Sequence, residues 1–179
     1  MDPLFIRFCD RLYLACVWLA GLAIFLMSII IPYGVFTRYV LGSGSAWPEP
    51  IAILFMMVFT FIGAAAGYRA GAHIAVTMVT DPMPTAVQGF CRVLVNLLMV
   101  LVCLFVCWYG TRLCIETWNQ SIAELEWLPV GVTYAAIPLG SLATLLFVLE
   151  RMIFGSQAER DIVRYEEVDA ATEQAEGAH

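Results

Sequence analysis

The stretch PIAILFMMVFTFIGAAAGY, residues 50–68, carries no charged residue and is long enough to cross a membrane. A helix rises about 1.5 Å per residue, so about 20 residues cross the roughly 30 Å of bilayer hydrocarbon. Three further uncharged runs of at least this length lie at 12–37, 93–111 and 127–149. These runs lack the alternation of a membrane β-barrel. We therefore predict an all-α integral membrane protein with four transmembrane helices.

The composition agrees with a chain that lives in lipid. Of its 179 residues, 61% are hydrophobic and 13% are charged, whereas a soluble domain is about half apolar and about a quarter charged. The net charge of −6 argues against a nucleic-acid partner. The first apolar run is too long for the core of a signal peptide and lacks a small-residue cleavage site, so we expect it to be retained.

The arginines predict the orientation, because cytoplasmic flanks of membrane helices are enriched in positive charge. Seven of the nine basic residues flank one side of the predicted spans, and only Arg38 and Arg112 flank the other. Both termini are therefore predicted in the cytoplasm. We expect residues 1–154 to form the transmembrane domain and the acidic residues 155–179 to form a disordered cytoplasmic tail.

Two short segments outside the spans are predicted to be interfacial helices. Residues 1–11 place apolar side chains before the first span. Between the third and fourth spans, apolar residues recur at helical spacing, which predicts an amphipathic extension of the third helix; they are Ile115, Trp118, Ile122 and Leu125.

Residue types limit the chemistry that this chain could perform. An independent small transporter usually needs a charged group inside a span, and no predicted span has one. The anchor subunit of a respiratory complex usually needs haem ligands, but the two histidines, His73 and His179, lie outside the spans. The six cysteines form no C-x-x-C motif and are expected to pack as small apolar residues. We predict no enzyme activity, no cofactor and no metal.

The stretch GAAAGYRAGAHIAV, residues 63–76, is the most distinctive. Gly63, Gly67 and Gly71 are four residues apart, a spacing that lets membrane helices approach closely. Arg69 falls where the second span ends, so we expect its guanidinium to bind lipid phosphates or a carboxylate of a partner. His73 follows one turn later on the same face. The alternative is that both residues only mark the membrane boundary.

A longer stretch, RYVLGSGSAWPEPIAILFMMVFTFIGAAAGYRAGAHIAV, resembles the signature of the DctQ-type small membrane subunit of tripartite ATP-independent periplasmic (TRAP) transporters. Trp47 and Glu49 fill its outer positions, although the family often has two adjacent acids where this chain has Glu49 alone. The glycines, Arg69 and His73 fill the later positions. The segment WLPVGVTYAAIPLGSLATLLFVLE is similar to the last span of the family.

The resemblance implies a role as a scaffold in the bacterial inner membrane. Such subunits assemble with a large elevator-type membrane subunit, where sodium is expected to bind, and a periplasmic binding protein delivers an organic acid. It also implies phospholipid neighbours. The glycines, Arg69, His73, Trp47 and Glu49 are then expected at the subunit or lipid interface. Three acids of the predicted periplasmic loop are candidates for docking the binding protein; they are Glu116, Glu124 and Glu126.

Overall fold

The computed structural model describes residues 4–42, 46–71, 85–123 and 125–155. Four long apolar stretches of helix are present in this part of the chain, which confirms the prediction of four membrane-spanning helices. The elements are α1 (Leu4–Tyr39), α2 (Pro48–Arg69), α4 (Thr85–Glu116), β1 (Ser121–Ile122), β2 (Leu125–Pro129), α5 (Val130–Tyr134) and α6 (Ala136–Phe154). The fourth span comprises α5 and α6 together.

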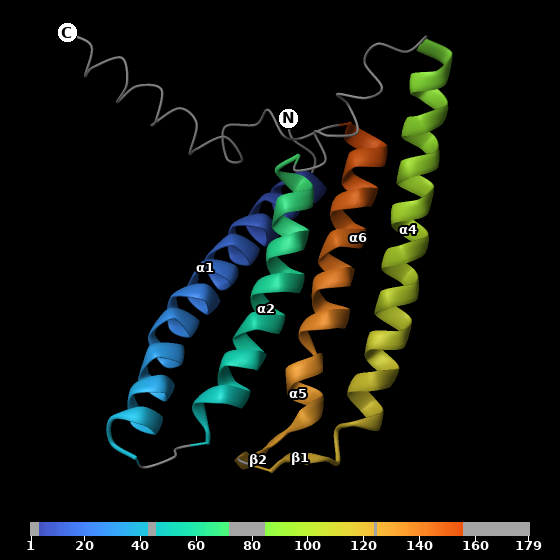
Figure 1. Ribbon diagram of the computed structural model, residues 1–179. Coiled ribbons are helices and arrows are strands. Elements are labelled where there is room, and N and C mark those ends of the chain that lie inside the picture. The colour runs from blue at the N-terminus through green and yellow to red at the C-terminus, as the bar shows by residue number, and fades with distance from the viewer. Residues whose placement is uncertain (1–3, 43–45, 72–84, 124, 156–179) are drawn as a thin grey trace, which may run out of the picture.

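The four long helices lie side by side in the order α1, α2, α6, α4 (Figure 1). Helix α2 packs between α1 and α6, and α4 packs mainly against α6 and α5. Each long helix therefore keeps much of its apolar surface exposed. In a bilayer that surface is available to lipid or to another protein.

Small side chains let the central helices approach closely. Ala65 of α2 is fully buried, and Phe147 and Val148 of α6 are 1% and 0% exposed. At Gly140 a Cβ atom would lie 2.6 Å from the carbonyl oxygen of Phe61. The backbones of α2 and α6 are therefore in contact, as is typical of membrane helices that meet at small residues.

The ends of the helices differ from the predicted interfacial segments. Helix α1 is continuous from Leu4, so the described part of residues 1–11 extends the first span. The predicted amphipathic extension of the third helix is wrong beyond Glu116. Helix α4 ends at Glu116, and the antiparallel pair β1–β2 follows. Short apolar runs are compatible with either helix or strand, and here residues 125–129 pair with β1.

We call the end of the molecule with this hairpin the hairpin end. The last turn of α1 and the first turn of α2 lie there too, whereas α1 begins and α2 and α6 finish at the opposite end (Figure 1). The predicted tail, residues 155–179, lies outside the described residues except for Gly155.

Candidate functional site

Arg69 lies at the centre of a buried ion cluster that joins three helices. Its Nε and Nη2 atoms donate hydrogen bonds to the two carboxylate oxygens of Glu150 in α6, at 2.8 and 2.7 Å. Nη2 also donates to Oδ1 of Asp10 in α1, at 2.6 Å. The fork of the guanidinium allows this two-pronged contact, which lysine cannot reproduce. We call these three residues the arginine cluster.

The cluster is enclosed by protein. The side chains of Arg69 and Glu150 are 2% and 1% exposed, and that of Asp10 is 12% exposed. The guanidinium carbon also lies 5.5 and 5.4 Å from the ring centres of Tyr13 and Phe147, within the range of cation–π attraction. The guanidinium thus faces carboxylates of its own chain, whereas its position at the end of the span suggested lipid phosphates or a partner.

The other members of the motif in residues 63–76 have different surroundings. A Cβ atom at Gly63 would meet Ala20 of α1 at 3.7 Å, so this glycine faces another helix of the same chain. Gly67 is half-buried. Gly71 has φ of 84°, a conformation that favours glycine, and follows directly on the residue that caps α2. His73 lies outside the described residues.

Trp47 and Glu49 lie at the hairpin end, far along α2 from Arg69. The rings of Trp47 and Tyr33 are 5.7 Å apart. Glu49 accepts a hydrogen bond from Nη2 of Arg38 at 3.3 Å, and both side chains are more than half exposed, at 71% and 54%. Since an exposed pair of this kind is weak, both charges remain available to other groups.

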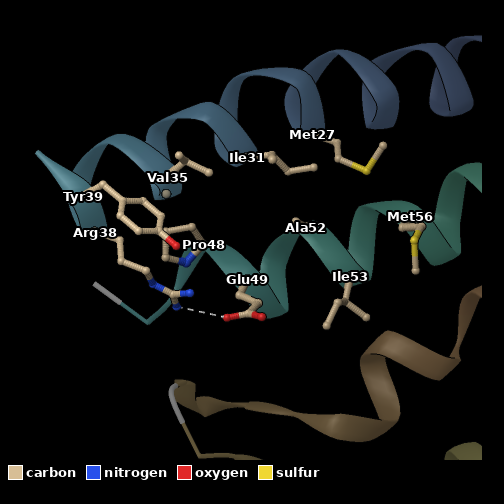
Figure 2. A pocket seen from close by; sticks show the side chains of 11 residues that line it. Met27, Ile31, Val35, Arg38, Tyr39, Pro48, Glu49, Ala52, Ile53 and Met56 are labelled. Atoms are coloured by element: carbon tan, nitrogen blue, oxygen red, sulfur yellow. Dashed lines mark hydrogen bonds and ion pairs between the residues drawn. The ribbon is translucent and has the colours of Figure 1, made fainter. Parts of the chain in front are cut away.

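A largely apolar cavity of about 440 Å³ opens beside this pair, between α1 and α2. Met27, Ile31 and Val35 of α1 and Ile53 and Met56 of α2 are among the residues that line it (Figure 2). We call it the groove.

A second cavity, of about 470 Å³, shares Arg38, Glu49 and Ile53 with the groove. Ile122 of the hairpin and Thr133 of α5 contribute to its wall. Thr133 is 7% exposed, and its hydroxyl oxygen has no hydrogen-bond partner among the described residues. We call it the polar pocket.

The three candidate docking acids are not alike. Glu116 lies 3.5 Å from Arg112 one turn earlier in α4, and both side chains are exposed. Glu126 belongs to β2, and Glu124 lies outside the described residues.

No cluster of metal ligands is present in the described ranges. Groups of three His, Cys, Asp or Glu side chains that could hold an ion are absent from this part of the chain. The six cysteines, all of which are described, are free thiols, and Cys9, Cys16 and Cys103 are buried.

Sequence reasoning singled out Arg69 but missed Asp10, Glu150, Arg38 and Thr133 as members of sites. One signal for the first two was present. Asp10 precedes the first predicted span, and Arg69 and Glu150 directly follow the second and fourth. Alternate spans run in opposite directions, so these three charges lie at the same end of the helices.

Comparison with known proteins agrees with the motifs. Residues 27–157 match the family of tripartite ATP-independent periplasmic transporters, DctQ component. A putative TRAP transporter small permease protein of Haemophilus influenzae is 25% identical over 128 residues, which cover 72% of this chain and 79% of that protein. The ectoine TRAP transporter small permease protein TeaB of Halomonas elongata is 23% identical over 125 residues, which cover 69% of this chain and 65% of that protein. The family match extends over most of the chain and includes all four spans at least in part, so the chain belongs to the DctQ component family of the tripartite ATP-independent periplasmic transporters.

Proposed function

We propose that this chain is the scaffold subunit of a TRAP permease in the bacterial inner membrane. In this proposal it binds a large elevator-type subunit that carries out sodium-coupled uptake, and a periplasmic binding protein delivers the substrate. An organic acid is the substrate class that the family resemblance favours. The name of one relative includes ectoine, so ectoine belongs among the compounds to test.

The exposed apolar surface of α4 is the observation that carries the scaffold role. In the most apolar part of α4 only 6% of the residues are buried, against 39% in the fourth span. Its exposed side chains include Leu97, Leu101, Phe105 and Trp108, which are 57–67% exposed. Close packing by a second membrane protein would bury this surface and gain dispersion contacts, which drive helix association in lipid.

The positions of the charged residues favour a scaffold role over a substrate path through this chain. At one end of the helices, Arg69 donates hydrogen bonds to Asp10 and Glu150. At the other end, Arg38 pairs with Glu49. Between these ends α1 and α2 contain no charged residue. The substrate path is therefore proposed to lie on the large subunit.

The proposed interface can be tested by photo-crosslinking in membranes that contain both subunits. A photoreactive amino acid at Leu101 of α4 should crosslink to the large subunit. The matched control is Leu22 of α1, because the two side chains are exposed to similar extents, 60% and 54%. Crosslinks from Leu22 but not from Leu101 would assign the interface to α1 instead.

The proposed function itself is tested by reconstituting uptake. Vesicles that contain the large subunit, the binding protein and a sodium gradient should take up substrate only when this chain is present. Uptake of equal rate without this chain would contradict the scaffold role.

A further inference from the structure

The groove and the polar pocket meet at the Arg38–Glu49 pair. Both cavities are lined by Arg38, Glu49 and Ile53. An elongated ligand could therefore place an apolar part in the groove and a polar part against the two charges. We propose that this composite site binds one zwitterionic phospholipid.

The apolar part of the site fits an acyl chain. Its walls come from two membrane-spanning helices and carry aliphatic and thioether side chains (Figure 2). Met27 and Met56 are unbranched and polarizable, so they adapt to a flexible chain. The volume of about 440 Å³ is in the usual range for small-molecule sites.

The charges at the rim fit a headgroup that carries both signs. Arg38 provides a guanidinium suited to phosphate. Glu49, on the adjacent first turn of α2, provides a carboxylate for an ammonium group. The two side chains are 3.3 Å apart and mostly exposed, so a lipid phosphate and ammonium could each replace one partner of this weak pair. An anionic phospholipid without the ammonium group would leave Glu49 facing negative charge.

The polar pocket offers a further contact for the headgroup. The Thr133 hydroxyl is buried and has no hydrogen-bond partner within the described ranges, which is costly for a buried polar group. Rotation of the Thr133 side chain would let this hydroxyl donate a hydrogen bond to a headgroup oxygen in the pocket. The aromatic pair Tyr33–Trp47 lies next to the site, where residues of this type usually mark the level of lipid headgroups.

Native mass spectrometry of the full-length chain tests the proposal. Delipidated protein in mild detergent is titrated with phosphatidylethanolamine or phosphatidylglycerol that carry identical acyl chains. We expect one tightly bound phosphatidylethanolamine and weaker binding of phosphatidylglycerol. Arg38→Gln should weaken phosphatidylethanolamine binding about tenfold, the usual effect of losing a hydrogen bond to a charged group. Glu49→Gln should abolish the preference between the two lipids.

Arg112→Gln is the matched control, because Arg112 also pairs with an exposed glutamate at a similar distance, 3.5 Å, but does not line either cavity. Ala52→Trp is a second test that keeps both charges and fills the groove, and it should prevent binding. Circular dichroism checks that each variant keeps its helices.

Three results would overturn the proposal. These are equal affinity for both lipids, preference for phosphatidylglycerol, and equal effects of Arg38→Gln and Arg112→Gln. A site that serves a protein partner instead would give the first or the third result. Uptake measurements are independent of this experiment, so failure of lipid binding would leave the proposed scaffold role standing.

Discussion

Arg69 binds two carboxylates from different helices, and each of the three buried charges is compensated by the others. Removing one member of a buried ion cluster leaves the remaining charge without compensation, which typically costs about 3–5 kcal/mol. Replacing all members by neutral groups of similar size is often harmless. The arginine cluster should therefore behave as a unit under mutation.

Arg69→Ala is expected to lower the free energy of unfolding by about 3–5 kcal/mol, because Asp10 and Glu150 keep their charges in a buried site. Arg69→Lys should be milder, since the charge survives but the two-pronged contact is lost. Titration with dodecyl sulfate, followed by circular dichroism, measures the change. The control Arg112→Ala breaks only an exposed pair within one helix and should cost no more than about 0.5 kcal/mol.

A neutral triple variant separates charge from packing. Combining Arg69→Met with Asp10→Asn and Glu150→Gln should recover most of the stability that Arg69→Ala loses. If the triple variant is as unstable as Arg69→Ala, packing of the guanidinium against Tyr13 and Phe147 matters more than its charge.

The sequence predicted that Arg69 is important but not what it binds. Local spacing relates residues three or four positions apart on a helix, whereas Arg69 is 59 residues from Asp10 and 81 from Glu150. Only the packing of α1 and α6 on α2 brings these groups together. The same limit applies to the polar pocket, where Thr133 of α5 lines the same cavity as Arg38 and Glu49.

At the level of elements, hydropathy was sufficient to predict the spans, because the cost of burying charge in lipid confines charges to their ends. It could not predict the hairpin. Ile115, Trp118, Ile122 and Leu125 have helical spacing, but short runs of apolar residues are compatible with either helix or strand. The described chain instead pairs β1 with β2, from Ile122 opposite Leu125 to Ser121 opposite Pro129.

Helix contacts lead to a prediction about glycine. Gly140→Ala should destabilise the protein by about 1–3 kcal/mol, the usual cost of overpacking, since the new methyl group would meet the backbone of α2 at 2.6 Å. Gly21→Ala is the control, because a Cβ atom there meets nothing within 4 Å. This control should be neutral or stabilising, as alanine favours helix over glycine by up to about 1 kcal/mol. Equal stability of the two variants would show that α2 and α6 are not in backbone contact.

At the scale of the whole molecule, the orientation in the membrane is a prediction from the arginines. Leu4 and Tyr39 lie near opposite ends of α1 and are 85% and 80% exposed. A membrane-impermeant thiol reagent added to intact cells should label Tyr39→Cys above the level of the unsubstituted chain and should not label Leu4→Cys. The reverse pattern would invert the orientation. The natural Cys9 cannot serve this purpose because it is fully buried.

The proposed docking of a binding protein also concerns the whole molecule. Changing Glu116, Glu124 and Glu126 together to glutamine should raise the concentration of binding protein needed for half-maximal uptake by reconstituted vesicles. Maximal uptake should hold, and the salt dependence should weaken, because surface charges mainly affect encounter rate and orientation. Physiological salt screens such interactions over about 8 Å. An unchanged concentration dependence at low salt would exclude this docking role.

The two ends of the α1–α2 pair are held together by different means. At one end, buried hydrogen bonds of 2.6–2.8 Å connect Arg69 to Asp10 and to Glu150. At the hairpin end, α1 and α2 touch at Gly34 and Pro48, and the ion pair there is exposed. We therefore expect the two helices to separate more readily at the hairpin end, within the reach of the connection between Tyr39 and Pro48, while the arginine cluster stays closed. Local opening of this kind governs amide hydrogen exchange, so exchange should be faster at residues 35–38 of α1 than at residues 13–16, which lie beyond its first turn. The same opening would give a lipid tail a sideways route between the two helices without unfolding the protein.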